Sequence, residues 1–259
     1  MYKNLLIEND GDVRSVLINR YERRNAVNTV TKKEITAAIN EAAQDGTVKA
    51  ILFGAVGDGA FCAGQDLEEG SEADTDASDM AVVYGNLFNC FRQCPKPVIG
   101  AISGSAFGSG FQLAMMPDYS IVAESAQLAM TEIVVGFPCI YGSILLWNAT
   151  LGMKAKELVL SGKRISAAEA QALGLVSEVV PQKEVRPLAL KTAHEWAQKP
   201  PTVFKWMKNL FALLTDDSMK FAAGYADKAY NAAYQANEPQ IYMQKFLRER
   251  RLAKAQGKV

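Results

Sequence analysis

The sequence predicts an α/β fold with a helical C-terminal part, and two observations lead to this prediction. Over the first 180 residues, short apolar strand-like segments alternate with amphipathic helical segments, a pattern typical of α/β proteins. From Lys183 onward the pattern is almost wholly helical, with breaks at Pro200-Pro201, around Thr215-Asp216 and near Glu238-Pro239. We therefore expect an α/β core followed by a helical appendage.

The individual elements follow from local signals. Residues 5–8 and 13–19 flank a polar Asn-Asp-Gly-Asp turn and predict a hairpin. A helix with Thr31 as its N-cap is expected to run to Gln44, and apolar residues 50–54 predict a buried strand after it. Further strands are expected at 97–102, 119–123, 127–130 and 175–180, and further helices at 80–93, 142–150, 154–161 and 167–173.

The composition excludes several classes of partner. The 259 residues include 28 Lys and Arg and 28 Asp and Glu, so no net charge attracts nucleic acid or a membrane surface. No stretch reaches the ~18 apolar residues of a membrane-spanning helix, and the N-terminal segment lacks a signal-peptide core. The four cysteines show no metal-ligand spacing. We expect free thiols, no metal, and a cytoplasmic protein that binds neither nucleic acid nor membrane.

The most informative segment extends from residue 99 to residue 132. A strand runs into a turn that contains Gly104, Gly108 and Gly110, and a helix and a second strand follow. Glycines let the backbone approach a ligand, and the first N–H groups of a helix have no partner within the helix. Glu132 follows about twenty residues after this turn. An acid near such donors predicts chemistry on a carbonyl that becomes an oxyanion.

A second loop, residues 60–67 (AFCAGQDL), directly follows the predicted strand 50–54 and its Gly57-Asp-Gly59 turn. Both loops therefore lie beyond the end of a strand. Open α/β sheets bind their ligands at such positions.

Five segments resemble the crotonase family, also called the enoyl-CoA hydratase/isomerase family. They are NRYERRNA (19–26), AFCAGQDL (60–67), KPVIGAISGSAFGSG (96–110), DYSIVAESAQLAMTE (118–132) and KELVLSGKRISAAEAQALGLVSEVV (156–180). The resemblance covers essentially the whole chain in the right order. It implies a crotonase-like spiral of ββα units that binds acyl-CoA (1–195) and a C-terminal helical trimerisation region (196–259). It also implies an acyl-CoA thioester substrate, no separate cofactor, and a homo-oligomer that is a trimer or a dimer of trimers.

The resemblance also assigns roles to residues. By position, the backbone N–H groups of Gln65 and Ser109 resemble the pair that holds the thioester oxygen in this family. Gln112 and Glu132 stand where family hydratases have two glutamates. A glutamine cannot exchange a proton near neutral pH, whereas a glutamate can. Glu132 as the single base favours isomerisation of the double bond, which resembles the family isomerases.

Further positions resemble the substrate-binding segments of the family. Arg24 suits a phosphate of CoA because a guanidinium pairs with phosphate oxygens. Tyr141 lies in a loop that lacks the second acid of some relatives, and its phenol is a candidate group of the acyl pocket. The candidates for substrate and CoA binding are Arg24, Ala26, Ala63, Gly64, Gly108 and Tyr141.

Alternatives remain open. One is hydration of a 2-enoyl-CoA, in which Glu132 and Gln112 share the water. Another is a catalytically weak acyl-CoA-binding subunit, which the glutamine at position 112 motivates. The acidic stretch 68–79, with six acids and no base, fits a solvated loop or a mobile flap that shapes the acyl pocket.

Overall fold

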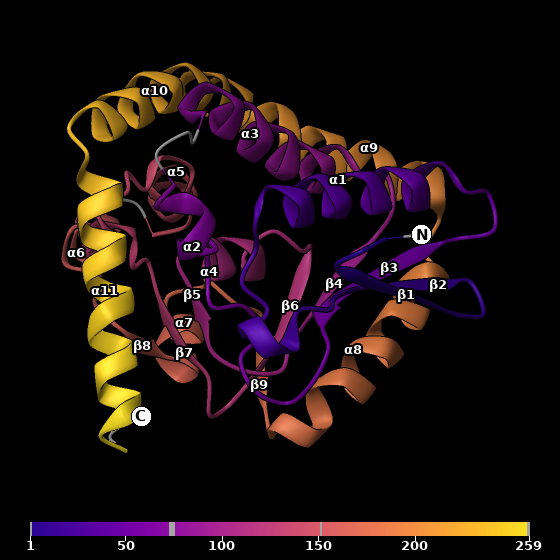
Figure 1. Ribbon diagram of the computed structural model, residues 1–259. Coiled ribbons are helices and arrows are strands. Elements are labelled where there is room, and N and C mark those ends of the chain that lie inside the picture. The colour runs from indigo at the N-terminus through magenta and orange to yellow at the C-terminus, as the bar shows by residue number, and fades with distance from the viewer. Residues whose placement is uncertain (1, 73–75, 151, 258–259) are drawn as a thin grey trace.

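The computed structural model describes residues 2–72, 76–150 and 152–257, and its centre is a six-stranded sheet in the order β1-β2-β3-β4-β6-β9 (Figure 1). The strands β1 (Leu5–Asp10) and β2 (Val13–Ile18) form the predicted antiparallel hairpin, and every later neighbour in this sheet pairs in parallel. The later strands are β3 (Ala50–Ala55), β4 (Val98–Ile102), β6 (Tyr119–Ala123) and β9 (Glu178–Val180).

Helices cover both faces of this sheet. On one side, α1 (Thr29–Gln44) packs beside α3 (Ala77–Gln93), and on the other side α8 (Gln182–Ala197) packs against β3, β4 and β6 (Figure 1). The central strands β3 and β4 are therefore apolar, and all five residues of β4 are buried. The predicted α/β class is confirmed.

A second, smaller sheet has the order β5-β7-β8 and lies beside the first. Its strands are β5 (Ala106–Phe107), β7 (Gln127–Ala129) and β8 (Ile165–Ser166). Short helices connect the two sheets, and they include the elements that carry the candidate site. These are η1 (Tyr21–Arg23), α2 (Leu67–Gly70), α4 (Ser109–Ala114), η2 (Glu132–Val135), α5 (Ile140–Thr150), α6 (Met153–Ser161) and α7 (Ala167–Ala172).

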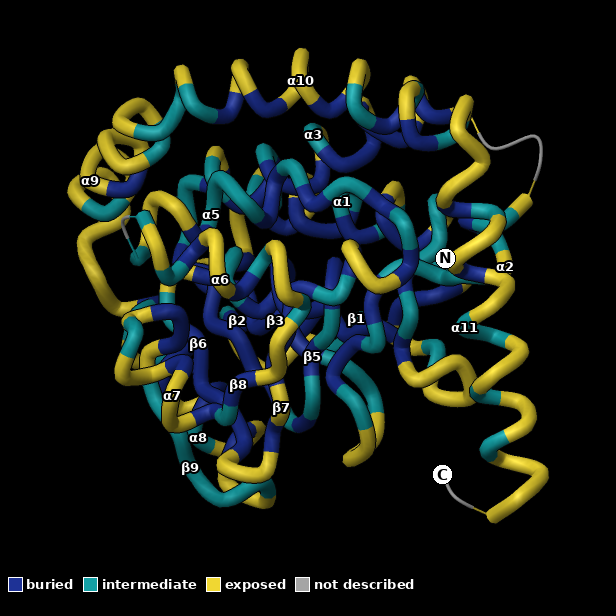
Figure 2. Tube along the Cα trace, turned by 90° about the vertical axis from the view of Figure 1, so that its left-hand side faces the viewer, coloured by how far each residue is buried: buried dark blue, intermediate teal, exposed yellow. Residues whose placement is uncertain are grey.

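The C-terminal helices fold back onto the same chain. They are α9 (Pro201–Leu214), α10 (Asp216–Gln235) and α11 (Glu238–Ala255). Helix α10 lies along α3 and α5, and α11 lies along α2 and η2 (Figures 1 and 2). A partly buried ion pair between Lys208 and Asp118, with 2.6 Å between Nζ and Oδ2, ties α9 to the residue before β6. Helix α8 crosses the predicted boundary between the core (1–195) and the C-terminal helical region (196–259), since it ends at Ala197. This division of the chain stays a prediction.

Some predicted boundaries were wrong for identifiable reasons. Helix α1 begins three residues early because Asn28, in extended conformation, accepts the N–H of Thr31 and is therefore the N-cap in place of Thr31. The predicted strand 175–180 shrinks to β9 because the Leu175 N–H bonds to Ala170 and extends the end of α7. Residues 73–75 of the acidic stretch, on which the flap hypothesis depends, lie outside the described residues. In the described ranges, no helix has the length and apolar character needed to cross a membrane.

Candidate active site

The two loops singled out in the sequence lie against each other. The N–H of Cys62 donates to Ser105 at 3.3 Å, and the N–H of Phe107 donates to Cys62 at 3.0 Å. This approach leaves no room for a side chain, because a Cβ added at Gly110 would lie 2.2 Å from the Cys62 carbonyl oxygen. A Cβ at Gly64 would lie 2.7 Å from the carbonyl oxygen of Phe107. The glycines thus bring residues 62–65 next to residues 106–110.

Two backbone donors face this contact. Ser109 is the first residue of α4, so its N–H has no partner within the helix. The bridge between Val27 and Gln65 uses the N–H groups of Val27 and Asp66 but not that of Gln65. Within residues 2–72, 76–150 and 152–257, neither Gln65 nor Ser109 donates its backbone N–H to an acceptor. Both predicted oxyanion donors are therefore available to a ligand.

Side-chain contacts link the same two residues. Tyr84 on α3 donates its hydroxyl to Gln65 Oε1 at 3.1 Å and lies 2.6 Å from Ser109 Oγ. Lys32 on α1 also donates to Gln65 Oε1, and its Nζ lies 4.2 Å from the centre of the Tyr84 ring. The Gln65 Nε2 donates to Glu69 Oε2 at 3.3 Å. The Gln65 side chain is therefore held at both ends.

Glu132 lies directly beside this turn. It is the first residue of η2 and is 6% exposed, and a Cβ at Gly108 would lie 3.5 Å from its carboxyl carbon. Burial raises the pKa of the Glu132 carboxyl above its ordinary value of 4.5, although hydrogen bonds to the carboxylate offset part of this rise. A raised pKa makes the carboxylate a better proton acceptor, as a general base requires.

Gln112 and Glu132 are in direct contact. The Gln112 Nε2 donates to Glu132 Oε1, while Glu132 Oε2 is buried without a hydrogen-bond partner among the described residues. Cys139 lies beside both groups, with its Sγ 3.8 Å from Gln112 Nε2, and its thiol lowers the pKa of the Glu132 carboxyl. Burial raises the pKa of the Cys139 thiol well above its usual value, so the thiol stays protonated. Gln112 thus anchors Oε1, while Oε2 has no hydrogen-bond partner in the described part of the chain.

Four of the residues predicted to bind substrate or CoA, namely Arg24, Ala26, Ala63 and Gly64, lie close together. Ala63 donates its N–H to the Arg24 carbonyl at 3.0 Å, and Val27 donates its N–H to the Gly64 carbonyl at 2.8 Å. The Ala26 carbonyl accepts from the guanidinium of Arg20. Arg24 is exposed and adopts a left-handed conformation with φ of 53°. The segment around residues 24–27 therefore borders the loop that carries Gln65.

Tyr141 belongs to an aromatic cluster on the other side of Tyr84. Its ring centre lies 4.9 Å from that of Phe88 and 6.3 Å from that of Tyr84, and its hydroxyl donates to the Ala81 carbonyl at 3.3 Å. Phe137 and Tyr230 complete this cluster. The Tyr141 phenol is thus bonded to α3, and its ring contributes an apolar wall near the site.

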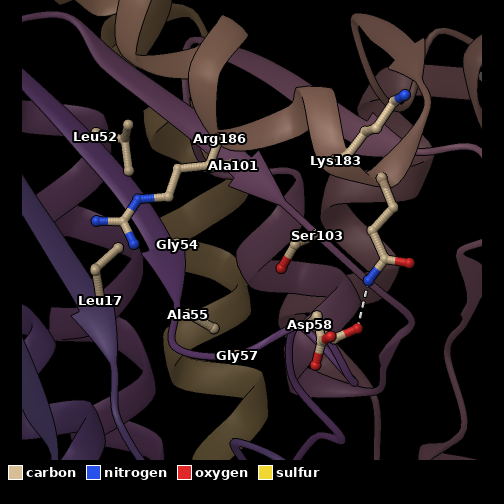
Figure 3. Close-up of a pocket in the computed structure, with 11 residues that line it drawn as sticks. Leu17, Leu52, Gly54, Ala55, Gly57, Asp58, Ala101, Ser103, Lys183 and Arg186 are labelled. Atoms are coloured by element: carbon tan, nitrogen blue, oxygen red, sulfur yellow. Dashed lines mark hydrogen bonds between the residues drawn. The ribbon is translucent and has the colours of Figure 1, made fainter.

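A cavity of about 630 Å³ lies elsewhere, between β3, β4 and the start of α8. Figure 3 shows Lys183 and Arg186 on its helical side and Asp58 on the loop opposite, where the Asp58 carbonyl accepts from the Gln182 side chain. None of the predicted site residues lines it. In the described part of the chain, no group of three His, Cys, Asp or Glu side chains could hold a metal ion.

Sequence reasoning missed three side chains of the site, namely Lys32, Glu69 and Tyr84. A signal for Lys32 was present, because positions 32, 35, 39 and 42 follow helical spacing and all four are buried. Tyr84 likewise belongs to the buried face of α3. Glu69 accepts the N–H of Thr29 at the start of α1, a tertiary contact that no local pattern indicates.

Comparison with known proteins places this geometry in a family. The family model described as enoyl-CoA hydratase/isomerase matches residues 8–256. The chain belongs to the enoyl-CoA hydratase/isomerase family. The resemblance drawn from the sequence is thereby confirmed, and the chain is an enzyme of a family that comprises hydratases and isomerases.

Individual relatives agree with this membership. A short-chain-enoyl-CoA hydratase of Clostridium acetobutylicum is 29% identical over 251 residues, which are 96% of either chain. A probable enoyl-CoA hydratase of Mycobacterium bovis is 31% identical over 253 residues, with the same coverage. A crystal structure of an enoyl-CoA hydratase/isomerase from Mycobacterium paratuberculosis superposes with a TM-score of 0.88 at 24% identity, over 95% of this chain and 99% of that one. The crotonase fold is therefore confirmed.

Proposed function

We propose that this enzyme moves a proton from C2 to C4 of the acyl group of an enoyl-CoA thioester. The double bond thereby moves from C3–C4 to C2–C3. The observation that carries this proposal is that the two carboxylate oxygens of Glu132 have different hydrogen-bond surroundings. One carboxylate oxygen is held by Gln112, the other has no partner among the described residues, and Gln112 itself cannot accept a proton. A single base suits a reaction that removes a proton and returns the same proton to a different carbon.

In the proposed reaction, the thioester oxygen of a 3-enoyl-CoA accepts the N–H groups of Gln65 and Ser109. Glu132 takes a proton from C2, and the electron pair of the broken C–H bond delocalises onto the thioester oxygen as a dienolate. The protonated Glu132 then returns the proton to C4, which forms the double bond between C2 and C3. One preorganised donor to such an oxygen contributes typically ~10²–10³ in rate.

Hydration of a 2-enoyl-CoA is the second candidate. It is favoured by the relatives that are named enoyl-CoA hydratases. In that reaction Glu132 would activate a water molecule that the Gln112 amide helps to orient. Because a glutamine supplies no proton, Glu132 would have to serve as base and then as acid.

A panel of 2-enoyl-CoA, 3-enoyl-CoA and 3-hydroxyacyl-CoA substrates separates these candidates. The proposal predicts that 3-enoyl-CoA is converted to 2-enoyl-CoA faster than 2-enoyl-CoA takes up water. Glu132→Gln preserves the shape of the site but removes the base, so its kcat should fall at least ~10²-fold. Glu124→Gln, at an exposed glutamate between β6 and β7, is the matched control and should keep the wild-type kcat.

Each outcome has a distinct meaning. Water uptake by 2-enoyl-CoA without isomerisation would establish the hydratase. Tight binding of CoA thioesters without any turnover would establish a catalytically weak acyl-CoA-binding subunit. Near-wild-type turnover in Glu132→Gln would remove Glu132 from the chemistry.

We also propose that the enzyme assembles as a trimer or a dimer of trimers. Helix α9 supports this, because its outward surface is apolar and is exposed in a single chain (Figure 2). The exposed side chains are Val203, Trp206, Met207, Leu210, Phe211, Leu213 and Leu214. Contiguous apolar surface of this kind is typical of an interface between proteins.

A further inference from the structure

Lys32 is fully buried and has no carboxylate partner. Its residue exposure is 0%, and it forms no ion pair with any Asp or Glu in the described ranges. Lys208, the other buried lysine, shows the usual arrangement, since its Nζ lies 2.6 Å from the Asp118 carboxylate. A buried ammonium without a counter-ion is costly, so the position of Lys32 calls for an explanation.

The contacts of Lys32 lead to the backbone donors. Its Nζ donates to Gln65 Oε1, the same oxygen that accepts the Tyr84 hydroxyl at 3.1 Å. That hydroxyl in turn contacts Ser109 Oγ at 2.6 Å. One polar chain therefore runs from Lys32 through Gln65 and Tyr84 to Ser109. Two of its members, Gln65 and Ser109, are the residues whose backbone N–H groups are available to a ligand.

Two carboxylates, Glu69 and Asp66, attract Lys32 but form no ion pair with it among the described residues. Glu69 on α2 accepts the Thr29 N–H at 2.9 Å, and the carboxylate of Asp66 pairs with Arg20 at 2.9 Å. The remaining titratable neighbours are Cys62, whose thiol has its pKa raised by burial to about 12, and Tyr84. Both are neutral near pH 7. The Gln65 amide thus lies between the ammonium, from which its Oε1 accepts, and the Glu69 carboxylate, to which its Nε2 donates.

We propose that Lys32 is a positioning residue that fixes the Gln65 side chain and places its positive charge next to a residue that holds the enolate oxygen. This inference rests on the proposed function, because it assigns that charge a part in stabilising the reaction intermediate. A charge fixed before the reaction stabilises an oxyanion without any reorganisation in the transition state. The ammonium acts through Gln65 and does not touch the reacting atoms.

The test uses a 3-oxoacyl-CoA, which ionises to an enolate in the site without turnover and reports by its ultraviolet absorbance. Lys32→Met removes the charge but keeps the volume, and Lys32→Gln keeps a donor for Gln65 Oε1 without the charge. Lys33→Met, on the exposed side of α1, is the matched control. We expect wild-type protein and Lys33→Met to raise the enolate fraction of the bound thioester above its value in solution. Relative to wild type, Lys32→Met should lower the ionisation constant of the bound thioester about tenfold, which is one pKa unit.

Two further readouts separate positioning from a general structural role. Burial lowers the pKa of Lys32 to about 8, so Lys32 loses its charge as pH rises through about 8. The difference in the ionisation constant of the bound thioester between wild type and Lys32→Met should therefore shrink over that range. Lys32→Met should also raise the melting temperature, because a buried charge disappears. In a Gln65→Ala background, which keeps the backbone N–H, Lys32→Met should have a smaller effect than in wild type.

The outcomes are unambiguous. An unchanged enolate fraction in both Lys32→Met and Lys32→Gln would overturn the inference, as would effects that add fully with Gln65→Ala. If Lys32→Met does not fold, Lys32→Gln alone decides. A wild-type protein that ionises the 3-oxoacyl-CoA but converts no enoyl-CoA would refute the proposed reaction and leave the role of Lys32 standing.

Discussion

Gln112 donates its side-chain N–H to Oε1 of Glu132, and this contact leaves Oε2 as a buried carboxylate oxygen with no partner among the described residues. The Gln112 amide thus fixes the orientation of the carboxylate without competing for a proton. The same contact makes the two oxygens of Glu132 inequivalent. Oε1 is anchored, and in the proposed reaction Oε2 is the oxygen that takes the proton.

The pH dependence of activity should report the burial of Glu132. Its pKa is raised above 4.5, chiefly by burial, and the base works only when deprotonated. Activity should therefore be complete above the raised pKa and should fall as pH decreases through it. The kcat/KM profile measures this as an acid limb that lies above pH 4.5. An acid limb at or below pH 4.5 would show that Glu132 is solvated or is not the base.

Gln112→Glu should shift the reaction toward hydration. A second carboxyl group at the position of Nε2 cannot ionise together with Glu132, so the pair should share one proton. The site would then hold an acid and a base on the two sides of a water molecule. We expect water uptake by 2-enoyl-CoA to rise relative to isomerisation of 3-enoyl-CoA, measured on the same preparation. Gln112→Met, which restores neither acid nor amide, should lower both rates.

Gly110→Ala should separate the two site loops. Its Cβ would lie 2.2 Å from the Cys62 carbonyl oxygen, so the backbone must move at a cost of about 1–3 kcal/mol or more in the free energy of unfolding. Gly224→Ala is the matched control, because a Cβ there meets nothing within 4 Å and α10 should gain about 0.5–1 kcal/mol. Chemical denaturation and kcat measure both effects. Full activity in Gly110→Ala would show that the close loop contact is dispensable.

A charge on α9 should break the oligomer. Trp206 and Phe211 are 68% and 66% exposed in a single chain, and a glutamate at either position would have to be desolvated in an interface. Light scattering after size-exclusion chromatography should show trimers or hexamers for wild type and smaller species for Trp206→Glu and Phe211→Glu. Gln235→Glu, at an exposed position near the end of α10, should keep the wild-type mass. A monomeric wild type at micromolar concentration would contradict the proposed assembly.

Much of the fold could be predicted because its signals are local. The hairpin turn between β1 and β2, the buried runs of β3 and β4 and the proline breaks before α9 and α11 each depend on neighbouring residues. Boundaries that depend on competing hydrogen bonds were harder. The N-cap of α1 is Asn28 and not the predicted Thr31, because the Asn28 side chain accepts the N–H of Thr31.

The candidate site, like the fold, could be predicted from the sequence only in part. The glycines of both loops, Gln112 and Glu132 stand in motifs that a reader of the sequence alone can select. Their meeting could not be derived from spacing, because Gln65 and Ser109 are joined only through Tyr84 on a third element. The role of Lys32 was hidden for the same reason.

By itself, the sequence identified the family, the strands of the central sheet in their order along the chain, and Glu132 as the candidate acid for proton transfer. Only the tertiary structure decided that a lysine from α1, a tyrosine from α3 and two loop amides share one buried polar chain. Local patterns record the preferences of the backbone and the periodicity of burial. Contacts between distant side chains depend instead on how the elements pack, and packing brings together residues that no short segment contains.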